Sequence, residues 1–354
     1  MSAAPIYPEP AKGLLALPIS RRAFTACALA CAAWPLAAQA PAPFEVLEFD
    51  WVDSARNRAV PVRLYWPEAA APGARLPLVV FSHGIGGSRR GYSYLGQHWA
   101  SNGMASLHLQ HVGSDRNVWF GNPLGMLGRL QDAAQEGEAI ARAQDLRFAL
   151  DQLLGTGSDF APRIDAERIA VAGHSYGANT ALLAAGARVE REGRVIDLRE
   201  PRARAAIVLS APPFYGEIEP SRILAPVTLP SLHVTATGDV IRIPGYYSGA
   251  EDRLAVFEAT GSAAKVLAVF EGGSHSMFTD RAGTGGVELN PQVKRATQEL
   301  SLAFLHHVFG LGDAQALPRW AERNRAIVAR FVGATGRLAV GAPSEPVAKA
   351  REAA

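Results

Sequence analysis

A serine lies between two glycines in the segment 173–177, whose sequence is Gly-His-Ser-Tyr-Gly. An apolar run at 168–172 precedes this segment, and an alanine- and leucine-rich run typical of a helix follows it. A strand that turns directly into a helix exposes the residue at the turn, and flanking glycines avoid side-chain collisions there. The pattern therefore predicts that Ser175 is a nucleophile for a carbonyl carbon. The alternative is a glycine-rich turn that contains a serine by chance.

Attack on an ester carbonyl also requires backbone N–H donors for the oxyanion that forms. Tyr176 is expected to supply one, because its amide lies at a helix N-terminus, where donors are unpaired and the helix dipole favours negative charge. The second donor is expected from residues 83–87, His-Gly-Ile-Gly-Gly, which follow an apolar run. By its position in this loop, Ile85 is the predicted donor. A simple glycine-rich turn is the alternative.

The general base must be a histidine that follows the nucleophile in the chain and lies in a loop at the carboxyl edge of the sheet. His233 falls inside a predicted strand, and His306 and His307 fall inside a predicted helix. His275 comes after the end of a predicted strand and a Gly-Gly-Ser loop. His275 is therefore the predicted base. His174, next to the nucleophile, is expected to point away from it and to pack or bond locally.

The acid that orients the base is expected between the serine and the histidine, at the end of another strand. Asp239 follows the predicted strand 230–236 and meets this condition. An ionised carboxylate there holds the imidazole in the required tautomer and stabilises the imidazolium. Glu251 and Asp252 are alternatives, although their spacing suits the first turn of a helix. The predicted order along the chain is Ser, Asp, His.

The elements that must position these residues alternate between strand and helix, which predicts an α/β fold with a mostly parallel central sheet and helices on both faces. We expect strands at 44–51, 60–66, 76–82, 104–109, 168–172, 205–210, 230–236 and 265–270. We expect helices at 92–102, 131–154, 177–188, 250–260, 291–309 and 314–332. The first two strands are expected to form a hairpin, and residues 112–130, rich in Gly and Asn, a loop.

With these residues assigned, the region 58–310 resembles the α/β-hydrolase superfamily, and within it bacterial predicted dienelactone hydrolases and platelet-activating-factor acetylhydrolase-like esterases. The similar stretches are 81–88, 94–101, 143–151 and 173–178. The resemblance implies the α/β-hydrolase fold and hydrolysis of carboxylic esters, with Ser175, Ile85 and His275 in the family's roles.

The chain departs from these families at two positions. Dienelactone hydrolases proper use a cysteine nucleophile, whereas this chain has Ser175. Animal platelet-activating-factor acetylhydrolases carry the acid after the strand that follows the nucleophile helix. That strand here leads into Ser210, and the acid is expected one strand later, at Asp239.

Aromatic residues in loops on the expected catalytic side are candidates for the substrate pocket. They are Trp119, Phe120, Phe214, Tyr246 and Tyr247. The alternative is that each covers the underside of its loop. We expect no cofactor and no metal.

The bulk composition is that of an ordinary globular protein. The chain has 354 residues, of which 48% are hydrophobic and 19% charged, with a formal net charge of +2. No basic stripe interleaves with aromatics, so nucleic acid is not an expected partner. A small-molecule or polymeric ester is the expected substrate.

The N-terminal part resembles a bacterial twin-arginine export signal over residues 1–40. Arg21 and Arg22 directly precede an apolar run at 23–38, which is too short and too alanine-rich for a stable membrane span. The run ends in Ala-Gln-Ala, with small residues at both positions that a signal peptidase reads. The pattern predicts a periplasmic or secreted protein. A membrane anchor or a misassigned start is the alternative.

The two cysteines, Cys27 and Cys31, both lie inside this signal, so the mature protein is expected to have neither a disulfide nor a thiolate metal site. Lipid attachment at Cys31 is an alternative to cleavage after Ala40. We expect a catalytic domain at 41–332 and a disordered tail at 333–354, which is rich in Gly, Ala, Pro and charge.

The sequence thus predicts a serine hydrolase that cleaves a carboxylic ester through an acyl-enzyme, with a Ser-His-Asp triad. A serine peptidase of the same fold is one alternative, because a fold does not decide the substrate. A non-catalytic binding protein on a hydrolase scaffold is another, although the sequence retains every expected triad member.

Overall fold

The computed structural model describes residues 42–68, 73–216, 219–243 and 245–333. The predicted export signal at 1–40 lies outside these ranges, as does the predicted tail at 333–354 apart from its first residue.

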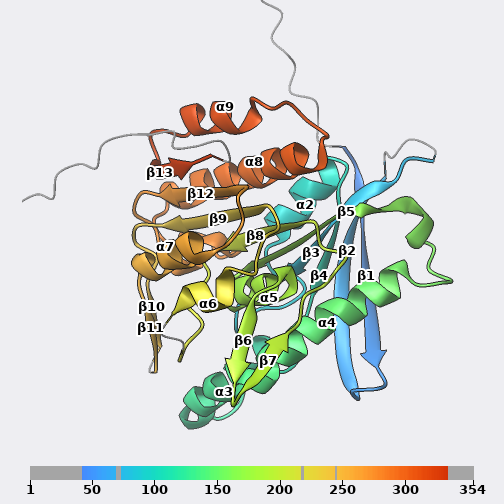
Figure 1. Cartoon of the computed structure of the whole chain (residues 1–354), viewed down its shortest axis with the longest axis vertical. Coiled ribbons are helices and arrows are strands. Elements are labelled where there is room, and N and C mark those ends of the chain that lie inside the picture. The colour runs from blue at the N-terminus through green and yellow to red at the C-terminus, as the bar shows by residue number, and fades with distance from the viewer. Residues whose placement is uncertain (1–41, 69–72, 217–218, 244, 334–354) are drawn as a thin grey trace, which may run out of the picture. The chain divides into compact units, whose positions relative to one another are not determined.

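A nine-stranded sheet forms the centre of the described chain, in the order β1-β2-β4-β3-β5-β8-β9-β12-β13 (Figure 1). Its strands are β1 (Phe44–Asp53), β2 (Arg58–Pro67), β3 (Leu76–Ser82), β4 (Ala105–Leu109), β5 (Ile164–His174), β8 (Ala205–Leu209), β9 (Ser231–Ala236), β12 (Lys265–Phe270) and β13 (Val328–Val332). The six strands from β4 to β12 in this order pair in parallel. Their carboxyl ends therefore meet at one edge, where α/β proteins bind ligands.

Antiparallel strands close both sides of the sheet. The hairpin of β1 and β2 pairs Phe44 with Pro67 at one end and Asp53 with Arg58 at the other. β2 then runs antiparallel to β4, and β13 runs antiparallel to β12. The six parallel strands are thus interior strands, in keeping with their continuous apolar sequences.

Helices cover both faces of the sheet, as predicted. The helices α2 (Ser93–Ser101), α8 (Leu289–Phe309) and α9 (Ala316–Arg323) share one buried cluster with the sheet. The helices α4 (Glu136–Leu154), α5 (Tyr176–Ala185) and α6 (Pro220–Leu224) share another, which α7 (Ala250–Ala259) joins through Val256. Neighbouring residues of β3 alternate between these clusters, with Val80 in one and Phe81 in the other.

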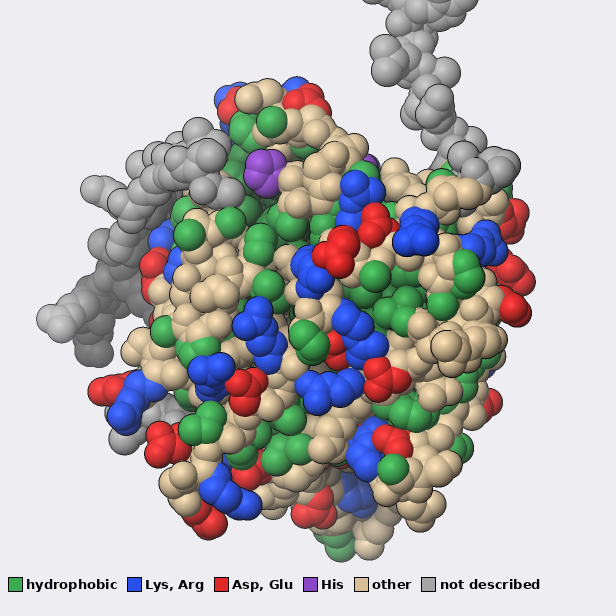
Figure 2. All heavy atoms as spheres, turned by 45° about the vertical axis from the view of Figure 1, so that its right-hand side comes forward, with side chains coloured by type: hydrophobic (Ala, Val, Ile, Leu, Met, Phe, Trp, Pro, Cys, Tyr) green, Lys and Arg blue, Asp and Glu red, His purple; other side chains and the backbone are tan. Residues whose placement is uncertain are grey.

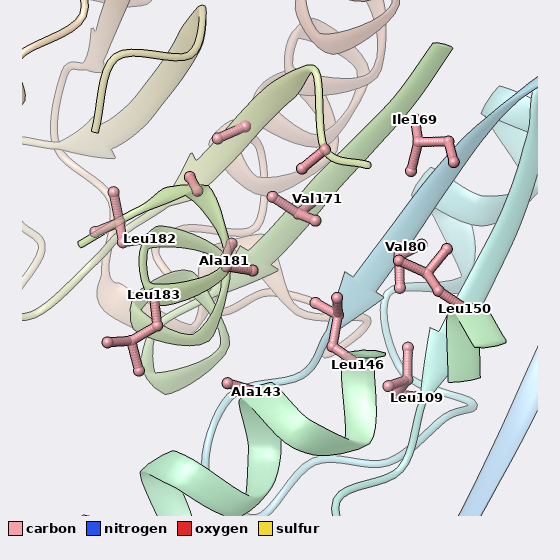
Figure 3. Packing of buried hydrophobic residues seen from close by; sticks show 14 of the residues in the cluster. Val80, Leu109, Ala143, Leu146, Leu150, Ile169, Val171, Ala181, Leu182 and Leu183 are labelled. Carbon is pink, nitrogen blue, oxygen red and sulfur yellow. The ribbon is translucent and has the colours of Figure 1, made fainter. Parts of the chain in front are cut away.

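The packing on the α4 and α5 side is drawn in Figure 3. Leu146 and Leu150 of α4 are fully buried against the same cluster as Val80 and Val171 of the parallel strands. The helix α5 also packs against β3 and β5.

The expectation of a loop over 112–130 was wrong in part. This stretch contains the short helices η1 (Arg116–Trp119) and η2 (Pro123–Gly125) and the start of helix α3 (Met126–Ala133). The predicted helix 131–154 is therefore two helices, because the chain leaves the helical conformation at Gln135, whose φ and ψ are −67° and 155°. Leu130 and Ala133 of α3 pack with Ile85 in a small buried cluster.

The expectation of a helix over 314–332 was also wrong in part. The helix α9 ends at Arg323, and Val328–Val332 form the edge strand β13. Val328 and Phe331 are buried, and pairing with β12 satisfies the backbone of this segment.

Two short hairpins were not predicted from the sequence. They are β6 (Arg188–Arg191) with β7 (Arg194–Asp197), and β10 (Ile241–Ile243) with β11 (Tyr246–Ser248). The first hairpin turns at Glu192 and Gly193, both with positive φ, as a two-residue hairpin turn requires. Strands of three or four residues give too little alternation to be recognised from sequence.

Acidic and basic side chains are intermingled over the face drawn in Figure 2, without a continuous basic stripe on that face. Within the described ranges, no helix combines the length and the apolar character that crossing a membrane needs.

Candidate active site

Ser175 occupies a sharp turn between β5 and α5. Its φ of 55° and ψ of −124° lie in a region that side-chain-bearing residues rarely adopt. A Cβ added at Gly173 would lie 2.0 Å from the Gly177 carbonyl oxygen, and one added at Gly177 would lie 1.9 Å from the Ser82 carbonyl oxygen. Both glycines are therefore required by close backbone packing around the serine.

The structure brings the three residues of the predicted triad together. His275 Nε2 lies 2.8 Å from Ser175 Oγ, and His275 Nδ1 lies 2.8 Å from Asp239 Oδ1. Asp239 follows β9 and His275 follows β12, so all three residues stand at carboxyl ends of parallel strands. These distances suit proton transfer from the serine hydroxyl to the imidazole.

The other candidate acids and bases lie elsewhere. Asp252 accepts a hydrogen bond from the Gly249 amide at 2.9 Å and so caps α7, whose exposed first turn also carries Glu251. His233 is buried within β9 and contacts Ser231 at 3.1 Å. His306 and His307 belong to the last turn of α8.

Asp239 is fully buried and surrounded by donors. Its Oδ2 accepts hydrogen bonds from the hydroxyls of Ser210 and Thr235, and Arg253 Nη2 lies 3.4 Å from its Oδ1. Burial alone raises the pKa of Asp239, but the hydrogen bond and charge of His275, with the charge of Arg253, hold this pKa well below its ordinary value. The carboxylate is therefore ionised at neutral pH.

Ser210 is a site residue whose role was not predicted. The sequence indicated only that Ser210, and not an acid, follows β8. It follows β8 with a φ of 55°, and its Oγ contacts both Asp239 and His275 Nδ1, the latter at 2.8 Å. Since the carboxylate can only accept, the Ser210 hydroxyl donates to Asp239. Its position at the end of β8, the strand next to β5, was the feature of the sequence that could have indicated a role in the site.

His174 is a buried link between two loops rather than a second base. Its Nε2 lies 3.0 Å from the His275 carbonyl oxygen, and its Nδ1 lies 2.9 Å from the Tyr92 hydroxyl. Because a carbonyl only accepts, Nε2 carries the proton and Nδ1 accepts from Tyr92. Burial, with the nearby His275, lowers the pKa of His174 to about 3, so the ring is neutral. The Gly84 amide donates to the same Tyr92 hydroxyl.

The glycine-rich loop, residues 83–87, places one amide beside the serine. The amides of Gly86 and Gly87 donate to the carbonyls of Ser114 and Gly84. Within the described part of the chain, the amides of Ile85 and Tyr176 have no acceptor, and both residues line the same cavity as the serine. These two amides are therefore available to a ligand.

Trp119 closes over the glycine-rich loop. Its indole Nε1 donates to the Gly86 carbonyl at 2.9 Å, while 41% of the residue stays exposed. A Cβ on Gly86, whose φ is 72°, would collide with this indole. The loop thus needs glycine at this position both for its conformation and for the contact with Trp119.

A cavity of about 400 Å³ opens beside Ser175 and His275. Three of the five predicted pocket aromatics line it, namely Trp119, Phe214 and Tyr246. The other two, Phe120 and Tyr247, do not line the cavity, and 60% and 65% of these residues are exposed to solvent.

The cavity wall is mostly apolar, and part of it comes from the two short hairpins that were not predicted. It includes Ile140 and Leu183 of α4 and α5, and the two short hairpins add Val189, Ile196, Ile241 and Ile243. Arg191 and Arg281 also line the cavity. Such a wall suits an apolar group held next to the serine.

Comparisons with known proteins agree with this architecture. Residues 51–117 match the family described as platelet-activating factor acetylhydrolase, isoform II. The chain is 26% identical over 159 residues to a platelet-activating factor acetylhydrolase of Cavia porcellus, which is 35% of each protein, so it spans about a third of that relative's length.

A solved structure is similar over a longer stretch. The ferulic acid esterase from Streptomyces cinnamoneus superposes with a TM-score of 0.54 and 26% identity, covering 77% of this chain and 92% of that one. The predicted fold class and the predicted resemblance to acetylhydrolase-like esterases are confirmed by these matches.

Proposed function

We propose that this chain, which has the α/β-hydrolase fold, is a serine hydrolase that cleaves carboxylic esters through an acyl-enzyme intermediate. The observation that carries the proposal is the hydrogen-bonded series of Ser175, His275 and Asp239, with 2.8 Å between each pair, beside an apolar cavity. Acyl transfer is the chemistry for which a serine, an imidazole and a buried carboxylate are arranged in this way.

In the proposed reaction, Ser175 Oγ attacks the acyl carbon while His275 Nε2 takes its proton. The negative charge that develops on the carbonyl oxygen is stabilised by the free amides of Ile85 and Tyr176. His275 then gives the proton to the oxygen of the leaving alcohol, and the acyl group remains on the serine. Water then attacks the acyl-enzyme while His275 takes its proton. The bond between the acyl carbon and Ser175 Oγ breaks, His275 returns the proton to Ser175 Oγ, and the acid is released. Asp239 stabilises the imidazolium at each step.

The substrate side of the proposal rests on the cavity walls and on the named relatives. The cavity is lined mainly by aliphatic and aromatic side chains and measures about 400 Å³, which suits an apolar or aromatic acyl or alcohol group. One relative is named for platelet-activating factor and the other for ferulic acid. Both names denote ester hydrolysis, and a small-molecule or polymeric ester is the proposed substrate class.

Hydrolysis of p-nitrophenyl esters by purified protein and by Ser175→Ala tests the proposal. We expect wild-type turnover and a loss of at least about 10⁴-fold in kcat for the variant, because the nucleophile is gone. A fluorophosphonate should label wild type and not Ser175→Ala. Ser158→Ala, a serine that bonds locally to Leu153, is the matched control and should behave as wild type.

The same assay separates the alternatives. Absence of both ester hydrolysis and labelling would contradict an enzyme and favour a binding protein. Faster turnover of aminoacyl anilides than of p-nitrophenyl esters would favour a peptidase instead.

A further inference from the structure

A fully buried arginine, Arg142 of α4, lies behind the glycine-rich loop. Its Nη2 donates to the His83 carbonyl, its Nη1 to Ser114 Oγ at 2.7 Å, and its Nε to Thr180 Oγ1 at 3.0 Å. Its guanidinium carbon also lies 4.5 Å from the centroid of the Tyr176 ring. One side chain therefore contacts both segments that carry the free amides.

In the glycine-rich loop, Arg142 is linked to residues on both sides of Ile85 in the chain. The His83 carbonyl precedes Ile85 by two residues. Beyond Ile85, the Gly86 amide donates at 2.8 Å to the backbone carbonyl of Ser114, whose hydroxyl accepts from Arg142. The position of the Ile85 amide is thus tied to Arg142 from both directions along the chain.

On the side of the nucleophile helix, Arg142 contacts the first turn of α5. Tyr176 and Thr180 are one turn apart, and the Thr180 hydroxyl donates to the Tyr176 carbonyl at 3.1 Å. The guanidinium contacts the Tyr176 ring and the Thr180 hydroxyl together. The helix turn whose free amide faces the cavity is therefore packed against the same group.

The charge of Arg142 is not cancelled by a direct partner. In the described chain no carboxylate forms an ion pair with Arg142, and the nearby Asp145 pairs with Arg56, Arg58 and His111 instead. Burial lowers the pKa of Arg142 to about 10, so the group stays cationic at neutral pH. A buried cation is costly unless a nearby anion compensates it.

We propose that Arg142 is a positioning residue for ester hydrolysis, which holds the Ile85 and Tyr176 amides in a fixed relation and favours the negative charge of the oxyanion between them. The inference rests on the proposed function. It assigns a role to a side chain that does not line the cavity and does not touch substrate. Glu138 and Asp145 attract the guanidinium without forming an ion pair with it, and the transient oxyanion then adds a further anion near the buried cation.

Kinetics of Arg142→Met and Arg142→Lys test this role. Met keeps the length without the charge, and Lys keeps the charge without the planar set of donors. On p-nitrophenyl butyrate we expect kcat to fall about 100-fold in the Met variant, as for loss of an oxyanion donor, with KM little changed. We expect a smaller fall for Lys.

A purely structural role predicts a different result, so two inhibitors are compared. A trifluoromethyl ketone, which forms an oxyanion on the serine, should bind more weakly in proportion to the loss of kcat. Butanol, which occupies the apolar cavity without an oxyanion, should inhibit equally in both proteins. Equal weakening of both inhibitors, or wild-type kcat in a folded Arg142 variant, would overturn the proposal.

Arg58→Met is the matched control, because Arg58 is a partly buried arginine that pairs with Asp145 and Glu138 and touches neither amide-bearing segment. It should lower the Tm without lowering kcat. If neither Arg142 variant folds, Ser114→Ala decides, since it removes one acceptor of Arg142 together with the hydrogen bond that Ser114 donates to Glu138; an unchanged kcat there contradicts the proposal. Wild-type hydrolysis that depends on Ser175 is measured first, which separates failure of this role from failure of the proposed function.

Discussion

The two sides of Ser175 are built around buried charges of opposite sign. We call the region of the glycine-rich loop, α4 and the first turn of α5 the amide side, and the region of Ser210, Asp239 and His275 the imidazole side. Arg142 is the buried cation that contacts the amide-bearing segments, and Asp239 is the buried anion that contacts the imidazole. Each side also contains a buried charge of the other sign, namely Asp145 on α4, which pairs with Arg56, Arg58 and His111, and Arg253 beside Asp239. Acyl transfer creates negative charge on the first side and positive charge on the second, so each side already holds the opposite charge.

The two sides also differ in the kind of group that they position. The amide side fixes backbone groups, through hydrogen bonds to the loop and packing of the helix turn. The imidazole side fixes one side chain, His275, in a loop that contains Gly272 and Gly273, both with positive φ. The neutral ring of His174 joins the two, since it donates to the His275 carbonyl and accepts from Tyr92, which in turn bonds the Gly84 amide.

The largest expected effect comes from removing the anion of the imidazole side. Asp239→Asn keeps the shape but removes the charge and favours the wrong imidazole tautomer, so kcat should fall about 10⁴-fold. Steady-state kinetics on p-nitrophenyl butyrate measure this. Glu251→Gln, at the alternative acidic position on the exposed first turn of α7, is the control and should retain wild-type kcat.

Retention of activity in Asp239→Asn, with loss in Glu251→Gln, would reverse the assignment of the acid. It would also remove the contrast between the two sides, because the buried Asp239 would then have no role in stabilising the imidazolium.

A smaller effect is expected from moving the anion within the imidazole side. Ser210 Oγ already lies 2.8 Å from His275 Nδ1, and its φ of 55° is one that Asp tolerates better than most residues. Adding Ser210→Asp to Asp239→Asn should therefore recover about 10- to 100-fold in kcat, as expected for a restored charge on the imidazole. Ser210→Asn in the same background is the control. Equal rates for the two double variants would show that the charge must come from the end of β9.

The last expected effect concerns stability against acid rather than turnover. His108, His174 and His233 are buried, and burial is the main cause that lowers the pKa of each to about 3. The unfolded chain takes up these protons below pH about 6.5 and the folded chain does not, so stability should fall between about pH 6.5 and 3 by about 1.4 kcal/mol per pH unit for each histidine. Urea unfolding at pH 7, 6 and 5 measures this dependence.

His233→Gln isolates one of these contributions, because His233 lies in β9 away from the link between the two sides. The slope of its unfolding free energy with pH should be smaller than that of wild type by one histidine's share. An unchanged slope would mean that His233 is protonated in the folded protein. Asp239 contributes in a separate, more acidic range, since its lowered pKa gives stability that is present above about pH 3.9 and lost below it.

Much of the site was predictable because its residues follow strand ends. Ser175, Asp239 and His275 each follow an apolar strand within five residues of its end, and parallel strands bring such positions to one edge. Ile85 and Tyr176 were predictable because each lies in a turn at a strand end. Ile85 lies in a glycine-rich loop, and Tyr176 lies at the start of a helix. The structure brings Ser175, His275 and Asp239 into contact and places Ile85 and Tyr176 on the wall of the same cavity as the serine.

Other parts of the site depend on contacts that local sequence does not encode. In the sequence, Arg142 has the pattern of an ordinary polar position of an amphipathic helix. Only the folded chain places it next to His83, which is 59 residues away. Ser210 acquires its role from Asp239 on the next strand. The hairpin β6–β7, which walls the cavity, consists of four-residue strands rich in arginine, whose pattern resembles a solvated loop.

The position of Trp119 gives the protein an optical property. Five of its six tryptophans lie in the described residues, and of these Trp119 is the one that is exposed, with its indole bonded to the glycine-rich loop and its ring on the cavity wall. An indole in that position changes its emission and its access to a soluble quencher when a ligand fills the cavity or when the loop moves. Binding beside Ser175 is thus observable by fluorescence without a label, including in Ser175→Ala, where no turnover interferes.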